Sequence, residues 1–164
     1  MKSPAKPKPR SKKSWNEKLD QTNGLPKLVP MPERMEKTWG KGTLVIPKPR
    51  EVDDLIAKVP KRKLMTVTQL AQRVAIPHKA TLGCPITTGI FAWMCAYAAD
   101  EQEEAGKKKI TPYWRILKAG GELNPRYPGG IENLQSRLEA EGHTVFQKGK
   151  RFFVKDYEKS LVKD

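Results

Sequence analysis

Residues 66–99 read TVTQLAQRVAIPHKATLGCPITTGIFAWMCAYAA, and this stretch predicts two helices joined by a short turn. Thr66 is suited to cap the first helix, and Pro77 ends it, because proline cannot continue the helical hydrogen bonding. The segment HKATLG is a turn, and Pro85 favours the first turn of the longer helix that follows. A short helix, a turn and a long helix indicate a helix-turn-helix unit, so we expect a mostly α, winged helix-turn-helix fold.

The long helix carries two kinds of apolar residue. The large ones follow the helical period at Ile86, Ile90, Trp93, Met94 and Tyr97. Such a stripe usually packs in a core, so we expect these side chains to be buried. The small ones form a second ridge, which allows another helix or a backbone to approach closely. They are Gly89, Ala92, Ala96 and Ala99.

The flanking segments add further elements. Residues 51–59, EVDDLIAKV, predict a helix, and residues 110–117, ITPYWRIL, are expected to be extended because of Pro112. Residues 131–140 predict another amphipathic helix, with Gly142 as its C-cap. Residues 143–157, HTVFQKGKRFFVKDY, alternate about a Lys-Gly-Lys turn and indicate a C-terminal β-hairpin. This hairpin either covers the edge of the core or acts as a wing that contacts backbone phosphates.

The chain has 164 residues, and its 32 Lys and Arg against 18 Asp and Glu give a formal net charge of +14. This excess attracts phosphate polyanions or anionic lipid surfaces and repels basic partners. The first 50 residues hold 13 Lys and Arg, 4 Asp and Glu and 8 of the 14 prolines, which opposes independent folding. We expect residues 1–43 to be a basic, Pro/Lys-rich, largely disordered tail and residues 44–164 to form one domain.

Cysteine usage and the N-terminal sequence exclude several classes of protein. Cys84 and Cys95 lie about 16 Å apart along one continuous helix, so they cannot form a disulfide. No cysteine or histidine spacing fits a zinc site, and we expect neither a metal nor a cofactor. The N-terminus lacks the apolar segment of a signal peptide, and residues 80–99 favour a buried helix over a membrane span. We expect a monomer in a reducing, cytoplasmic compartment.

Four ordered motifs between residues 110 and 143 resemble a known DNA-repair domain. They are TPYWRIL at 111–117, GGEL at 120–123, YPGGIE at 127–132 and LEAEGH at 138–143. Together with residues 56–75, they resemble the C-terminal domain of the alkylguanine-DNA alkyltransferases, a winged helix-turn-helix domain. The resemblance covers residues 51–143 and leaves out the first fifty residues and the C-terminal hairpin.

The active alkyltransferases carry Pro-Cys-His-Arg-Val, in which the Cys accepts the alkyl group and the His, supported by a Glu, relays a proton. By this resemblance Tyr113 takes the Cys position and Trp114 takes the His position, whereas Arg115 is retained and Glu141 matches the supporting Glu. A phenol is a poor nucleophile near neutral pH, because its pKa is about 10. Trp114 supplies no base, so the resemblance implies no alkyl transfer and no enzyme activity.

A separate hypothesis is an enzyme that uses another cysteine. In it, Cys84 at the start of a helix is the reactive thiolate, and His143 and Glu141 supply the base.

The alkyltransferase-like proteins replace the acceptor Cys, often by an aromatic residue, and bind alkylated DNA without transfer. Tyr113 is similar to that pattern, and Trp114 departs from it because many such proteins keep the His. The family's arginine finger falls on Ile86, where an apolar residue would act as a wedge between base steps, and its nucleotide-rotating tyrosine falls near Val67. Two interpretations stay open here: Tyr113 and Trp114 line a lesion pocket, or they fill it.

The favoured hypothesis is a non-enzymatic, alkyltransferase-like protein that binds double-stranded DNA, recognises alkylated guanine and flags it to other repair proteins. Its pocket would be formed by Tyr113, Trp114, Arg115 and Glu141. The expected nucleic-acid contacts are Lys61, Arg62, Lys63, Thr66, Ile86, Thr87, Thr88, Lys107, Lys108, Lys109, Lys148, Lys150 and Arg151. The alternative is a basic module that binds RNA or a ribonucleoprotein and has lost lesion recognition. The DNA hypothesis places the protein at the nucleoid, and no membrane binding is expected because the tail lacks an apolar helical face.

Overall fold

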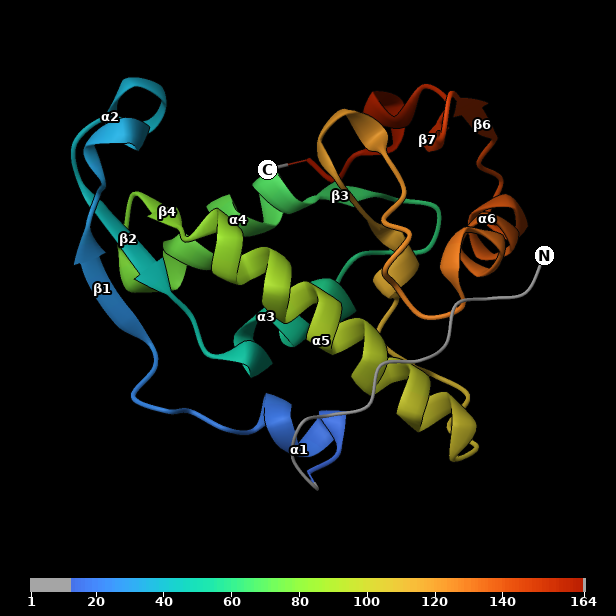
Figure 1. Ribbon diagram of the computed structural model, residues 1–164, viewed down its shortest axis with the longest axis horizontal. Coiled ribbons are helices and arrows are strands. Elements are labelled where there is room, and N and C mark those ends of the chain that lie inside the picture. Colours follow the sequence, from blue (N-terminus) through green and yellow to red (C-terminus); the bar gives the residue numbers. More distant parts are fainter. Residues whose placement is uncertain (1–12, 164) are drawn as a thin grey trace.

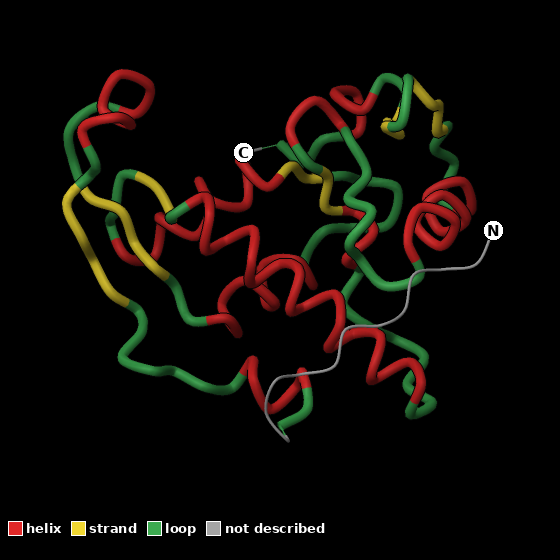
Figure 2. Tube along the Cα trace, viewed as in Figure 1, coloured by secondary structure: helices red, strands yellow, loops and turns green. Residues whose placement is uncertain are grey.

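The computed structural model describes residues 13–163, in which helices predominate and strands are short (Figure 1 and Figure 2). The longest helix, α5 (Pro85–Glu104), runs through the middle of the molecule, and the other elements surround it. Three small sheets lie within the described residues, with the strand orders β1-β2-β4, β3-β5 and β6-β7. The mostly α fold class expected from the sequence is therefore confirmed.

The elements around α5 come from both sides of it in the sequence. Before it stand α1 (Trp15–Leu19), β1 (Lys27–Pro30), α2 (Glu33–Trp39), β2 (Thr43–Ile46), α3 (Pro49–Ala57), β3 (Met65–Thr66), α4 (Val67–Ala75), the 3-10 turn η1 (Ile76–His78) and β4 (Leu82–Gly83). After it stand the 3-10 turns η2 (Tyr113–Arg115), η3 (Ala119–Gly121) and η4 (Tyr157–Ser160), the strands β5 (Ile116–Leu117), β6 (Val145–Lys148) and β7 (Arg151–Val154), and α6 (Gly130–Ala140).

Several helix and strand boundaries follow local sequence signals. The Thr66 hydroxyl accepts a hydrogen bond from the Gln69 backbone N–H at 3.2 Å, and the Gln69 side chain accepts one from the Thr66 N–H at 3.1 Å, a reciprocal cap for α4. The C-terminal hairpin is present as the antiparallel pair β6 and β7. The extended conformation expected for residues 110–117 is only partly right. Pro112 stands at the N-cap of the turn η2, and only β5 is extended, in parallel pairing with β3.

The buried face of α5 is formed mostly by small side chains, with Tyr97 as the large exception. Ala92, Cys95, Ala96 and Ala99 are each at most 1% exposed, and they join the two largest core clusters. The expectation that the large apolar stripe packs in the core is wrong at the start of the helix, where Ile86 and Ile90 are 66% and 51% exposed. The physical reason is that neighbouring elements approach a helix closely only where its side chains are short, so the small ridge takes the buried face.

The N-terminal segment packs on the other half of α5. Trp15 in α1 is 7% exposed and meets Trp93 edge to face, with ring centroids 5.0 Å apart, and it also contacts Tyr97 at 5.6 Å. Leu19 is buried beside it. These contacts bury aromatic surface of α5, which stabilises the docked helix.

Hydrogen bonds fix the same docking. The Asn16 side-chain amide donates to the Ala98 carbonyl at 2.9 Å and to the Glu101 carboxylate at 3.0 Å. Further along, β1 pairs antiparallel with β2. The expected disordered tail up to residue 43 is therefore wrong for residues 13–43, which contain α1, β1 and α2. Residues 1–12 of that tail lie outside the described residues.

We expect Trp15→Ala to lower the free energy of unfolding by about 3–5 kcal/mol, because it removes a large buried aromatic side chain. Denaturation in guanidinium chloride, followed by circular dichroism, measures this change. Leu28→Ala is the control, because Leu28 is 55% exposed on β1, and it should shift the free energy by about 0.5 kcal/mol or less. Equal stability of both variants would mean that α1 does not dock on α5 in solution.

Candidate nucleic-acid interface

Tyr113, at the position that the resemblance gives to the acceptor cysteine, is packed into the core. Its side chain is 1% exposed, and its hydroxyl oxygen accepts a hydrogen bond from the Asn133 amide at 2.8 Å. The rings of Trp114 and Tyr127 meet it edge to face, with centroids at 5.3 and 6.1 Å. Burial raises the pKa of the Tyr113 phenol further above its ordinary value, so the group stays protonated at neutral pH. Of the two sequence interpretations, the geometry fits a filled position.

Glu141 ties together the other residues of the predicted pocket. The Arg115 guanidinium donates to both of its carboxylate oxygens, at 2.9 Å through Nε and 2.6 Å through Nη2, and the Trp114 indole N–H donates at 3.1 Å. The Arg62 backbone N–H adds a bond of 3.3 Å. Burial alone would raise the pKa of Glu141, but the bonds from Arg115 and Trp114 outweigh it, so its pKa lies below the ordinary value. The cluster therefore works as a charged crosslink.

The sequence analysis missed two residues of α6 that complete this cluster. The side-chain amide of Asn133 donates its N–H to the Tyr113 hydroxyl, and the Oδ1 of the same amide accepts a hydrogen bond from Arg137 Nε at 3.0 Å. The Arg137 guanidinium lies over the Trp114 ring at 4.7 Å from its centroid. Asn133 and Arg137 are four residues apart on one helix, and this spacing is the sequence signal that marks them as neighbours.

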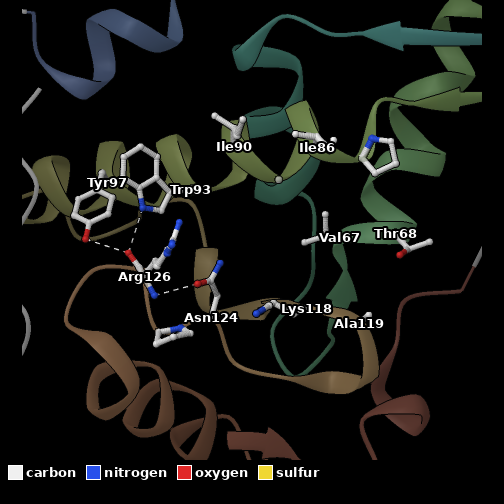
Figure 3. A pocket seen from close by; sticks show the side chains of 13 residues that line it. Val67, Thr68, Ile86, Ile90, Trp93, Tyr97, Lys118, Ala119, Asn124 and Arg126 are labelled. Carbon is white, nitrogen blue, oxygen red and sulfur yellow. Dashed lines mark hydrogen bonds between the residues drawn. The ribbon is translucent and has the colours of Figure 1, made fainter. Parts of the chain in front are cut away.

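A cavity of about 850 Å³ lies along the exposed stripe of α5 (Figure 3). One wall is α5, through Ile86, Ile90, Trp93 and Tyr97, together with the start of α4 at Val67. The facing wall is the chain from Lys118 to Arg126, and Tyr113 does not line the cavity. The expectation of a buried stripe is thus wrong for Ile86 and Ile90, which are exposed at this wall, and confirmed for Tyr97, which joins the core cluster against which Trp93 and Met94 pack.

Polar groups are few in this cavity and come mainly from its facing wall. The Arg126 carbonyl accepts hydrogen bonds from the Trp93 indole N–H at 3.3 Å and the Tyr97 hydroxyl at 3.1 Å, as Figure 3 shows. Asn124 accepts a bond from the Arg126 backbone N–H at 3.0 Å. The cations of its lining are Arg126 and Lys118, and the Lys118 ammonium lies 3.7 Å from the Glu122 carboxylate. A mostly apolar cavity with a few fixed polar groups is typical of a ligand site.

Some of the expected nucleic-acid residues reach this cavity, and others do not. Ile86 lies at its edge. Thr88 is completely buried and Thr66 is used as a helix cap, so neither is free for the expected contact. The Thr87 hydroxyl donates to the Cys84 sulfur at 3.4 Å.

The expected lysine contacts are distributed over distant parts of the surface. Lys107, Lys108 and Lys109 follow the C-terminal end of α5, about 30 Å along the helix from Ile86. The exposed Lys61, Arg62 and Lys63 follow α3, and Lys148 and Lys150 belong to the hairpin. Arg151 is engaged by Glu122, with 2.6 Å between its Nη2 and Oε1. Only a long ligand contacts all of these groups at once.

Within residues 13–163, no group of three or more His, Cys, Asp or Glu side chains is placed to hold a metal ion. None of the helices in that part of the chain has the length and apolar character needed to cross a bilayer.

Comparison with solved structures shows which fold this is. A structure of S. pombe Atl1 in complex with damaged DNA containing O6-carboxymethylguanine matches with a TM-score of 0.51 and 18% identity, over 71% of this chain and 94% of the other. A structure of S. pombe ATL in complex with DNA matches with a TM-score of 0.50, at the same identity and coverage. No protein-family profile and no curated protein sequence matches the chain. The likeness establishes the fold, in agreement with the motifs of residues 110–143.

We expect Glu141→Gln to lower the free energy of unfolding by about 3 kcal/mol at pH 7, because Arg115 would lose its buried charge partner. The folded-state pKa of Glu141 is depressed, so its contribution is complete above the ordinary value of 4.5 and is lost as pH falls through the lowered pKa. Denaturation between pH 7 and pH 3 measures both effects. The variant should therefore lose less stability in acid than the unaltered protein.

Glu139→Gln is the matched control, because Glu139 is exposed on the same helix, α6. It should leave the pH profile and the stability at pH 7 unchanged within about 0.5 kcal/mol. A Glu141→Gln protein with the acid profile of the control would contradict the role of the carboxylate as a crosslink.

Proposed function

We propose that this is a non-enzymatic DNA-binding protein of the alkyltransferase-like type, which binds duplex DNA along α4 and α5. The observation that carries the proposal is the exposed apolar start of α5, with Ile86 and Ile90 at the edge of the 850 Å³ cavity. In this interpretation α4 and α5 form a helix-turn-helix pair, and the β6–β7 hairpin is its wing. The net charge of +14 supplies the sequence-independent attraction to phosphates.

The apolar end of α5 favours a site on deformed DNA. An exposed isoleucine such as Ile86 inserts between base steps in the manner of apolar wedges, which unstack neighbouring bases. A base displaced from the duplex needs a concave site with aromatic surface and a few polar groups. Trp93, Tyr97 and the Arg126 carbonyl provide these in the adjacent cavity. We propose that an alkylated guanine occupies this cavity and not the filled position at Tyr113.

Alkyl transfer is not part of the proposal. The Tyr113 phenol is buried and stays protonated, and the Cys95 thiol is fully buried, which raises its pKa well above the ordinary value. Cys84 stands at the N-cap of α5, whereas Glu141 and His143 follow α6. Burial lowers the pKa of His143, and its Nε2 has no hydrogen-bond partner within the described residues.

The proposal also covers the partners, the oligomeric state and the location of the protein in the cell. A protein that holds a lesion without repairing it needs a second protein to remove it, so the partners are DNA and other repair proteins. It acts as a monomer, in the compartment of the DNA, which for a nucleoid is the cytoplasm.

We expect fluorescence anisotropy to give tighter binding to a duplex with one O6-methylguanine than to the same unmodified duplex, with both affinities falling as salt rises. Ile90→Glu should weaken both by about tenfold, because a carboxylate at the α5 face repels phosphates. Leu28→Glu makes the same charge change on β1 and should have little effect. Equal affinity for both duplexes would contradict recognition of alkylated guanine and leave only general DNA binding. Displacement of DNA by a structured RNA at lower concentration would favour the RNA alternative.

Mass spectrometry tests the absence of transfer. After incubation with an O6-methylguanine duplex, we expect the intact mass to be unchanged, because neither cysteine combines exposure with an activating base. A stoichiometric gain of one methyl group on Cys84 or Cys95 would show that the protein is a transferase.

A further inference from the structure

The β6–β7 hairpin presents two different faces. Directly opposite residues of an antiparallel pair point to the same side, so the register places Phe146 and Phe153 on one face together with Lys148 and Arg151. The other face, with Val145, Val154 and Phe152, packs on the core beneath the hairpin. The outer face is therefore both aromatic and cationic.

The two outer rings form a stacked pair. The centroids of Phe146 and Phe153 are 5.6 Å apart with 21° between the ring planes, and Phe146 is 44% exposed. The Arg151 guanidinium lies 5.2 Å from the Phe153 centroid. Neither ring belongs to the group that packs on the core, so the hairpin would keep its inner packing without them. A stacked aromatic pair whose outer ring, Phe146, is exposed offers a π-surface to a flat ligand.

The hairpin is also tied to the segment that links Ala119 and Asn124, two residues that line the cavity. The Leu123 backbone N–H donates to the Phe152 carbonyl at 2.9 Å, and Arg151 pairs with Glu122 at 2.6 Å. Residues 122 and 123 do not line the cavity themselves, but they join the two parts of the facing wall, Lys118 with Ala119 and Asn124 to Arg126 (Figure 3). Arg151 therefore fastens the hairpin, and the exposed Lys148 and Lys150 remain as the cations of its outer side.

We propose that the outer face of the hairpin binds unpaired DNA nucleotides, with a base stacked on the Phe146–Phe153 pair and phosphates at Lys148 and Lys150. Bases inside a duplex cover each other's faces, so only an unpaired base reaches an aromatic platform. Lysines beside aromatic rings match the phosphates and bases of one strand. This inference rests on the proposed function: DNA opened at α5 would expose a strand beside residues 118–126, to which the hairpin is bonded.

The test asks whether binding of single-stranded DNA needs an aromatic ring at position 146 or only an apolar side chain there. Fluorescence anisotropy with a labelled twelve-nucleotide oligo-dT measures binding by the full-length chain, and Phe146→Leu, which removes the ring, should weaken it by about 5- to 100-fold. Phe146→Trp should restore binding to that of the unaltered protein. Leu28→Ala, at another exposed apolar position, should change nothing. Thermal melts establish that each variant is folded, which is expected because Phe146 lies outside the core.

Fully paired duplex separates this inference from the proposed function. Phe146→Leu should change the affinity for an unmodified, blunt duplex less than twofold, whereas Ile90→Glu should weaken it. If the unaltered protein does not bind duplex DNA but binds oligo-dT in a Phe146-dependent way, the proposed function is overturned and the hairpin site is kept. Equal effects of Phe146→Leu on both ligands, no effect on oligo-dT, or binding of oligo-rU in preference to oligo-dT would overturn the hairpin site.

Photo-crosslinking locates the contact directly. Oligo-dT with 5-iodouracil at each position should crosslink to Phe146 or Phe153, read by mass spectrometry of the digested protein. Crosslinks confined to residues outside β6 and β7 would contradict the proposal.

Discussion

The small side chains on the buried face of α5 are the constraint on which the rest of the structure depends. Neighbouring elements come close to a helix only over residues such as Ala92, Ala96 and Ala99, which are all at most 1% exposed here. The large apolar side chains at the start of the same helix lie outside this face, whereas Tyr97, further along, joins the core. Ile86 and Ile90 therefore face the cavity, and Trp93 receives Trp15 from α1. One packing requirement thus produces both the core and the candidate interface.

The residues that the resemblance places at catalytic positions have structural contacts in this chain. Tyr113 fills its surroundings with an aromatic ring, and Arg115 and Glu141 form a buried ion pair that joins the end of α6 to η2. An ion pair of this kind holds elements in place when both charges have further hydrogen bonds, as Arg115 has to the Val59 carbonyl and Glu141 has from Trp114. The residues at these positions thus pack into the fold, while the open cavity is lined by other residues.

Arginine and lysine are used differently. Arg50 pairs with Asp20 and Asp53, and Arg115 and Arg151 pair with buried carboxylates, because the planar guanidinium forms several directed bonds at once. Lysines such as Lys148 instead extend into solvent, where they set the electrostatic field. The structural cations and the cations available to a polyanion are therefore largely separate sets. This separation allows the protein to bind phosphates without weakening its own ion pairs.

The sequence alone determined the elements whose causes are local: the cap at Thr66, the start of α5 at Pro85, the hairpin about Gly149, and the family motifs of residues 110–143. Predictions from the sequence were less accurate where a residue's burial depends on partners far away in the chain. The burial of Trp15 depends on an aromatic pair almost eighty residues away, so composition alone indicated a disordered tail. Which face of α5 is buried depended on how closely its neighbours approach, and the tertiary structure decided it. Periodicity shows that a helix has two faces, but only packing decides which of them remains open to a ligand.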